Sequence, residues 1–262
     1  MMTKKVNPFH LVEKSPWPIL ASVSALLLTL SAIVMMNTSW KMMTIISLLT
    51  ALVSSFNWWR DIYRESSFMG EHPTKIMKGL KMGMILFITS EVLFFVSFFW
   101  SFFHSSITPA MELGQVWPPK SIEVFDPMSI PLLNTMLLLS SGISITWSHH
   151  EMMKKNFKMS KKSLGVTILL GAVFTILQAL EYINAPFCLS DSIFGTTFFV
   201  MTGFHGIHVT IGTAFLTVSL KRIQLMMNSP THFLSFEMSA WYWHFVDVVW
   251  LFLYTMIYWW GM

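Results

Sequence analysis

Five ionisable side chains stand in stretches of the sequence that otherwise consist almost entirely of apolar residues. They are the carboxylic acids Glu91 and Asp247 and the imidazoles His205, His208 and His244. A charged group inside a bilayer costs at least about 2.5–3.5 kcal/mol, so each of these side chains needs a proton or a partner. Acids and imidazoles placed together can hold and relay protons. The residue types therefore predict a buried, proton-related polar cluster, and these two acids are the ones that the sequence places inside the apolar stretches.

The spacing of these residues supports a shared site. His205 and His208 are three residues apart and lie on one face of a helix, and the same holds for His244 and Asp247. At a rise of about 1.5 Å per residue, Glu91, His208 and Asp247 come within roughly one helical turn of one another in depth. The alternative is structural, because membrane helices also use polar side chains to fix their packing. The sequence leaves both interpretations open.

The same histidines do not form a convincing metal or haem site. Cys188 is the only cysteine, which excludes four-cysteine iron–sulfur or zinc sites and a two-cysteine copper site. His205 and His208 lie on one helix and cannot hold the two faces of a haem. His149 and His150 adjoin lysines, and the chain has no H-E-x-x-H motif. We therefore expect no metal and no redox cofactor in this chain.

The composition indicates which elements position these residues. Of the 262 residues, 54% are hydrophobic and 11% charged, whereas soluble domains carry about a quarter charged residues. This excludes a disordered chain, a fibrous repeat and an ordinary soluble enzyme. A bilayer core of about 30 Å needs about 20 apolar residues per helix. Seven stretches fit: 16–36, 42–59, 82–103, 129–148, 163–183, 193–220 and 239–260.

These stretches should be helices. Only helices and closed barrels satisfy the backbone in lipid, and the runs are too long and continuous for barrel strands. The first stretch is interpreted as a retained span and not as a signal peptide, because it lacks a small-residue cleavage site. The predicted fold is all-α, a polytopic membrane bundle of seven transmembrane helices.

The basic residues fix the orientation of this bundle. With seven spans, 15 of the 17 Lys and Arg residues fall on the side of the N-terminus, and only Lys41 and Lys120 fall on the other side. This is the positive-inside pattern, which places the N-terminus in the cytoplasm or in an organelle matrix. The pI of about 9.2 therefore reflects topology and attraction to anionic lipid, and no nucleic-acid partner is expected.

The basic side also offers candidate lipid contacts. Trp58, Arg60 and Arg64 form an aromatic and basic edge after the second span, and Arg222 ends the sixth. Such edges hold anionic lipid head groups, although any membrane helix can end in this way. Residues 60–81 form a predicted loop that separates two helices from five. We accordingly expect a division into residues 1–70 and 71–262.

The strings in the sequence resemble subunit III of cytochrome c oxidase in its mitochondrial form, in the order of that family and over essentially the whole chain. The matching strings are Trp58-Trp59-Arg60-Asp61, Ser90-Glu91-Val92, Phe98-Phe99-Trp100, His104-Ser105-Ser106, Trp117-Pro118-Pro119, Pro131-Leu132-Leu133-Asn134-Thr135, Ser144-Ile145-Thr146-Trp147-Ser148-His149-His150, Gly203-Phe204-His205-Gly206-Ile207-His208, Trp241-Tyr242-Trp243-His244-Phe245-Val246-Asp247 and Trp259-Trp260-Gly261.

The resemblance implies a 2 + 5 arrangement of helices, with a V-shaped cleft that holds phospholipids such as cardiolipin or phosphatidylglycerol. Glu91 corresponds to the membrane glutamate of the family, and His205 and His208 to its nearby histidines. The lipid contacts of the family carry over to Trp58, Arg60, Arg64 and Arg222.

The resemblance also implies the activity and the partners. The chain would be a subunit without catalytic residues of its own in a proton-translocating oxidoreductase. Haem and copper would lie in subunits I and II, which take electrons from cytochrome c, reduce O₂ to water and pump protons. Accessory subunits complete the complex. This subunit would support proton uptake from the matrix and protect the catalytic subunit. It would lie in the mitochondrial inner membrane, with its N-terminus in the matrix and its C-terminus in the intermembrane space.

Two other functions compete with this one. A stand-alone proton channel or secondary transporter would use Glu91, His208 and Asp247 as its path, but the paired, broken half-helices of many transporters are absent from the sequence. A lipid-organising scaffold would share the fold and have no proton role.

Overall fold

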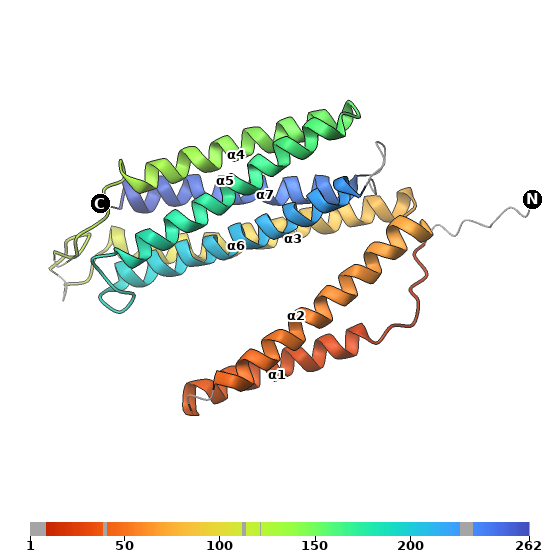
Figure 1. The fold of residues 1–262 in the computed structure, drawn as a ribbon. Coiled ribbons are helices and arrows are strands. Elements are labelled where there is room, and N and C mark those ends of the chain that lie inside the picture. The colour runs from red at the N-terminus through yellow and green to blue at the C-terminus, as the bar shows by residue number, and fades with distance from the viewer. Residues whose placement is uncertain (1–8, 39–40, 112–113, 121, 226–232, 262) are drawn as a thin grey trace, which may run out of the picture. The chain divides into compact units, whose positions relative to one another are not determined.

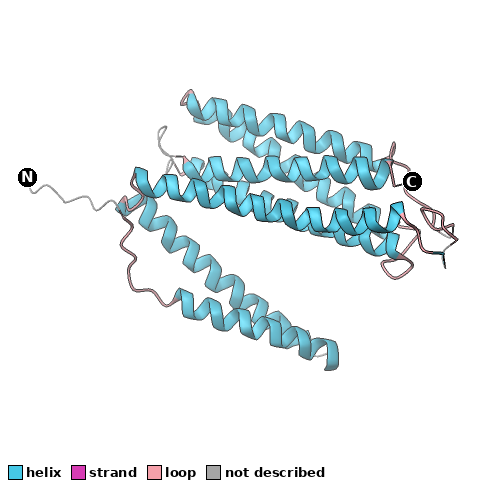
Figure 2. Cartoon of the chain, turned by 180° about the vertical axis from the view of Figure 1, so that it is seen from behind, coloured by secondary structure: helices cyan, strands magenta, loops and turns pink. Residues whose placement is uncertain are grey.

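The computed structural model describes residues 9–38, 41–111, 114–120, 122–225 and 233–261. Within these ranges the chain forms helices and loops and contains no strand (Figure 2). The all-helical fold and the seven α-helices confirm the prediction, and α2 and α7 each continue into a short π-helix (Figure 1). The elements are α1 (Trp17–Thr38), α2 (Lys41–Arg64), η1 (Glu65–Met69), α3 (Thr74–Ile107), α4 (Ile130–Met153), α5 (Phe157–Ile183), α6 (Ile193–Gln224), α7 (Leu234–Leu253) and η3 (Tyr254–Trp259).

Six of these helices, α1 to α6, are long and apolar enough to cross a membrane. The seventh, α7, has the predicted place but is not among these six, and it carries Glu237, His244 and Asp247. It packs against α4 and α6, and its Trp243 and Trp250 are fully buried. A helix enclosed by its neighbours can carry polar side chains that a lipid-facing helix cannot.

The helices extend further than the apolar stretches predicted. Helix α3 has 34 residues, and the predicted loop 60–81 is helical except for residues 70–73. Gly70 ends η1 with a φ of +70°, a left-handed conformation that glycine adopts without strain. Polar residues beyond a span continue the helix because its backbone hydrogen bonds do not depend on lipid.

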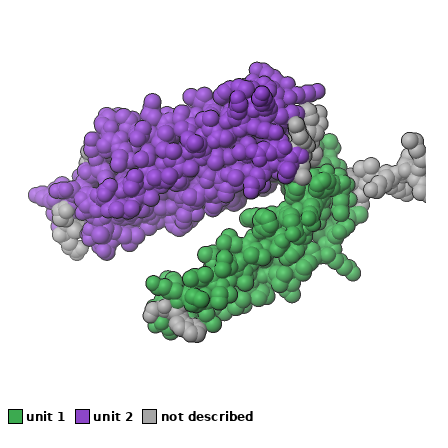
Figure 3. Space-filling model, in the orientation of Figure 1, with its two compact units in different colours: residues 1–80 green, residues 81–262 purple. Residues whose placement is uncertain are grey.

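The chain divides into two compact units, residues 1–80 and 81–262 (Figure 3). The sequence placed the division after residue 70, whereas the division between the units falls after Leu80, inside α3. Helices α1 and α2 belong to the first unit, and α4 to α7 to the second.

The α1–α2 pair has a polar seam and an apolar exterior. Its buried side chains are Ser24 and Ser31 on α1 and Ser47 and Ser54 on α2. The hydroxyls of Ser31 and Ser47 lie 2.7 Å apart, and those of Ser24 and Ser54 lie 3.4 Å apart. Small residues of this kind let membrane helices approach closely while their Leu and Ile side chains face lipid.

The second unit is built around Trp243 of α7. Its indole N–H donates to the hydroxyl of Ser141 on α4 at 2.8 Å. A Cβ atom added at Gly171 of α5 would lie 2.6 Å from the Trp243 ring, and one at Gly212 of α6 would lie 2.9 Å from it. Two glycines therefore make the space in which this tryptophan packs.

Helix α3 meets α6 and α7 through a layer of aromatic rings. The ring of Phe204 on α6 lies 5.1 Å from Phe94 and 5.5 Å from Phe98, and Phe95 lies 6.2 Å from Phe245 on α7. Such pairs contribute about 0.5–1.5 kcal/mol each beyond the burial of their surface. This layer holds the part of α3 that follows Glu91 against α6.

Candidate functional site

The structure pairs Glu91 of α3 with His208 of α6. The carboxylate oxygen Oε2 of Glu91 lies 2.9 Å from Nε2 of His208. The second ring nitrogen, Nδ1, lies 2.7 Å from the carbonyl oxygen of Phe204, one turn earlier in α6. Both nitrogens of His208 are therefore engaged, and the imidazole is held in one orientation.

This geometry defines where protons can sit. A carbonyl oxygen only accepts, so Nδ1 of His208 carries a proton and donates it to Phe204. One further proton then lies between Oε2 and Nε2. On Glu91 it makes a neutral acid–imidazole pair, and on His208 it makes a carboxylate–imidazolium pair. The arrangement can hold a single proton and move it between the two atoms along one hydrogen bond.

The surroundings of the pair are aromatic and only partly closed. The rings of Phe95, Tyr242 and Phe245 lie 5.2, 6.3 and 6.2 Å from the His208 ring. The side chains of Glu91 and His208 are 22% and 11% exposed. In a low-dielectric environment this hydrogen bond is stronger than in water.

His205 occupies a different environment, deeper in the bundle. Its Nε2 lies 3.2 Å from the carbonyl oxygen of Val246 on α7 and donates to it. Its ring packs between Phe174 and Trp250, with centroids at 5.6 and 5.2 Å. Nδ1 is buried and has no hydrogen-bond partner among the described residues. His205 thus fastens α6 to α7 and forms no bond with Glu91 or His208 in the described part of the chain.

His244 and Asp247 lie on another side of α7, against α4. A Cβ atom built on Gly142 would be 2.9 Å from Oδ2 of Asp247 and 3.9 Å from Nδ1 of His244. Asp247 is 7% exposed, and its Oδ1 has no partner among the described residues. The five residues of the predicted cluster are thus distributed over the α3–α6 contact, the α6–α7 contact and the α4–α7 contact.

A third acid, Glu181, corrects the prediction that the spans hold only two. It lies in the last turn of α5 and is 1% exposed. Its Oε1 accepts a hydrogen bond of 2.7 Å from Tyr258, whose hydroxyl also lies 3.5 Å from Nε2 of Gln178. Gln178 in turn accepts from Asn134 of α4 at 3.4 Å. The signal for this network was the Gln178–Glu181 spacing of three residues, which puts both on one helix face.

The predicted lipid edge contains a carboxylate between its cations. Oδ1 of Asp61 lies 3.2 Å from Nε of Arg60 and 4.0 Å from a guanidinium nitrogen of Arg64, and its Oδ2 accepts from the Trp17 indole at 2.6 Å. Asp61 thus neutralises one of two positive charges and joins α1 to α2. The arginine side chains stay 41% and 58% exposed, while Trp58 is partly buried.

Arg222, the remaining residue predicted to bind lipid, is partly buried in the last turn of α6. It belongs to the second unit, whereas Arg60 and Arg64 belong to the first.

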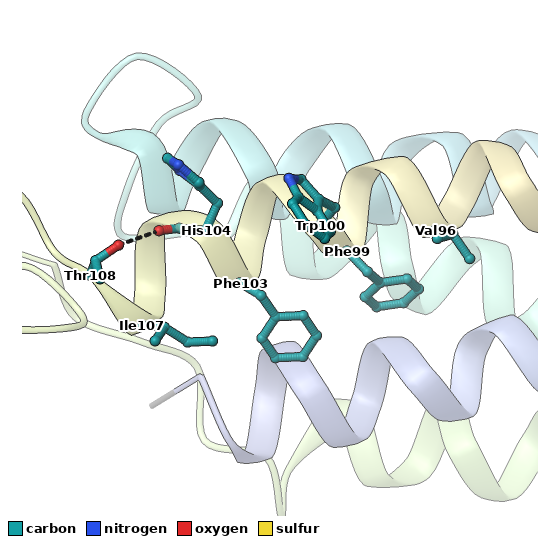
Figure 4. A pocket seen from close by; sticks show the side chains of 7 residues that line it. All are labelled: Val96, Phe99, Trp100, Phe103, His104, Ile107 and Thr108. Carbon is teal, nitrogen blue, oxygen red and sulfur yellow. Dashed lines mark hydrogen bonds between the residues drawn. The ribbon is translucent and has the colours of Figure 1, made fainter.

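The surface of α3 carries an apolar hollow of about 590 Å³ (Figure 4). Its lining residues are Val96, Phe99, Trp100, Phe103, His104, Ile107 and Thr108. The hydroxyl of Thr108 donates to the carbonyl oxygen of His104 at 3.0 Å, so this polar group serves the helix itself. The sequence did not predict this hollow, because it depends on how neighbouring side chains of one helix splay apart.

The described residues contain no group of three His, Cys, Asp or Glu side chains that could hold a metal ion. The nitrogens of His208 are both engaged, and Nε2 of His205 is bonded to Val246.

The sequence matches a known protein family over almost its whole length. The family model described as cytochrome c oxidase subunit III matches residues 7–262. The chain belongs to the cytochrome c oxidase subunit III family. The cytochrome c oxidase subunit 3 of Rhipicephalus sanguineus is 58% identical over 254 residues, which cover 97% of this chain and 99% of the relative. That of Ornithorhynchus anatinus is 53% identical over 260 residues, which cover 99% and 100%.

Membership of the cytochrome c oxidase subunit III family confirms the resemblance read from the sequence. Together with the helices long and apolar enough to cross a membrane, it establishes a multi-pass membrane protein and a subunit of an oxidoreductase complex.

Proposed function

We propose that this chain is a non-redox core subunit of the respiratory cytochrome c oxidase, and that it supports proton uptake through the Glu91–His208 pair. The observation that carries the proposal is the 2.9 Å contact between Oε2 and Nε2, with Nδ1 committed to the carbonyl of Phe204. A pair built in this way exchanges a proton without exchanging an electron.

The charges at the lysine-rich end of the bundle support a direction for this uptake. This end is the predicted side of the N-terminus, to which 15 of the 17 Lys and Arg residues belong. Lys81 pairs with Glu237 at 2.6 Å. It precedes Glu91 by ten residues, so the two lie about 15 Å apart along α3. Protons would enter from this side and reach Glu91 at its exposed edge. In a mitochondrion this side is the matrix, with the C-terminus in the intermembrane space of the inner membrane.

The partners follow from the same proposal. Subunits I and II supply haem and copper, which take electrons from cytochrome c and pass them to O₂, and accessory subunits complete the complex. This chain itself binds no metal or redox cofactor. Anionic phospholipids such as cardiolipin or phosphatidylglycerol contact Trp58, Arg60, Arg64 and Arg222. The exposed guanidinium groups support this part of the proposal.

The proposal is tested by comparing oxidase preparations that contain and lack this chain. We expect equal iron and copper per complex, continued oxidation of cytochrome c, and slower proton uptake from the lysine-rich side without the chain. A loss of iron or copper that follows this chain contradicts the non-redox assignment. Equal proton uptake in both preparations at every pH contradicts the proton role and favours a lipid-organising scaffold.

A further inference from the structure

The contact between α4 and α7 contains a carboxyl group that the Glu91–His208 pair does not use. Asp247 is 7% exposed, and the described part of the chain offers its Oδ1 no hydrogen-bond partner. Oδ2 lies over the backbone of Gly142, where an added Cβ would be only 2.9 Å away. A buried carboxylate without a partner is costly, so this group needs a proton.

Two imidazoles lie between this carboxyl and the lysine-rich end. Nδ1 of His244 and Oδ2 of Asp247 both lie within 4 Å of the same point above Gly142. His149, seven residues after Gly142, is about 10 Å closer to the lysine-rich end of α4. Its ring stacks on Phe236 of α7 at 6.1 Å, and Phe236 lies eight residues before His244 on the same helix.

The exposure of these groups decreases with depth. His149 and His244 are partly exposed, whereas Asp247 is buried. The lysine-rich loop that follows α4 contains Lys154 and Lys155. Two titratable groups of α6 also face this stretch of α7: His205 is bonded to the backbone of Val246, and the ring of His208 lies 6.3 and 6.2 Å from the rings of Tyr242 and Phe245.

We infer that Asp247 is a second proton-binding site, loaded from the lysine-rich side through His149 and His244. In loading, His149 takes a proton from solution and returns to the neutral state by passing one to His244. His244 passes a proton to the Asp247 carboxylate, which becomes a neutral acid. The inference deepens the proposed function, on which it rests for the complex in which it acts, and it adds a site separate from Glu91–His208.

Infrared difference spectra of the intact oxidase between acidic and alkaline pH test this assignment. We expect a carboxylic-acid band that is lost in Asp247→Asn and retained in Glu91→Gln. Gly142→Ala should shift the band, because a methyl group at 2.9 Å must displace the carboxyl. Gly165→Ala is the matched control, since its added Cβ meets nothing within 4 Å. If the Asp247→Asn complex does not assemble, the shift of the band in Gly142→Ala tests whether the band belongs to Asp247.

The route is tested by the rate at which this band responds to deuterated water. His149→Gln should slow the exchange about a hundredfold or more, in line with the effect of a positioned proton carrier. His150→Gln is the control, because His150 is exposed and lies one residue further along. Equal rates in the two variants overturn the route. The separate site is overturned if the band remains in Asp247→Asn, is unshifted in Gly142→Ala or disappears in Glu91→Gln. The rate of proton uptake in Glu91→Gln is a different measurement, and it tests the proposed function instead.

Discussion

Replacing Glu91 by Gln and by Ala separates its hydrogen bond from its proton. In the native chain Oε2 lies 2.9 Å from Nε2 of His208, and Nδ1 donates to Phe204. Gln has the same size as Glu, and its amide N–H can donate to Nε2 in place of the acid. We therefore expect Glu91→Gln to cost no more than about 1 kcal/mol of stability, the net contribution of one hydrogen bond.

Glu91→Ala has a larger expected cost. It leaves Nε2 of His208, a side chain that is 11% exposed, without a partner in a ring of aromatic side chains. An unsatisfied buried polar group costs about 1–3 kcal/mol. The expected order of stability is native, then Glu91→Gln, then Glu91→Ala.

Thermal unfolding of the intact complex, followed by a probe on this chain, measures this order. Ser97→Ala is a suitable control on α3, because Ser97 is exposed and its hydroxyl donates to the carbonyl of Phe94 in its own helix. Equal losses for Gln and Ala would refute the reasoning, since they would mean that the amide does not replace the acid as a partner. An unaffected Glu91→Ala complex would show that the pair contributes nothing to the fold.

Two further predictions concern packing in the second unit. Gly171→Ala places a methyl carbon 2.6 Å from the Trp243 ring and should lower the free energy of unfolding by about 1–3 kcal/mol. Gly165→Ala, the control, has open space around it and should be neutral or stabilising by up to about 1 kcal/mol. Equal unfolding temperatures for the two variants would contradict this prediction. Tyr258→Phe removes the hydroxyl that donates to Glu181 at 2.7 Å and should cost about 1–3 kcal/mol of stability in the same assay. A variant as stable as the native chain would show that the hydrogen bond is dispensable.

The seven helices were predictable because lipid leaves the backbone few alternatives. Apolar run length gave their number and order, and the helix ends were less accessible. Helix α3 begins at Thr74 and ends at Ile107, beyond the apolar stretch at both ends, since a helix continues through polar residues once it has formed. The π-helix that ends at Met69 likewise has no signal in hydrophobicity.

The sequence predicted how deep each site residue lies along its helix, but it did not predict which neighbouring helix each side chain faces. Residue spacing placed Glu91 and His208 at similar depth, and the structure brings them into contact. It could not show that Asp247, at a similar depth, faces α4 instead. Such directions depend on which helices are neighbours, and that is set by glycine and aromatic packing over long sequence distances. Glu181 was overlooked because it lies at the very end of a span, where acids are common.

The most direct test of the proton role is the rate of proton uptake by oxidase carrying Glu91→Gln, reconstituted in vesicles and measured from the lysine-rich side. Because the amide keeps the hydrogen bond to His208 but cannot release a proton, we expect slower uptake with unchanged iron, copper and assembly. Uptake at the native rate at every pH would contradict the assignment of the Glu91–His208 pair as the group that holds and passes on the proton.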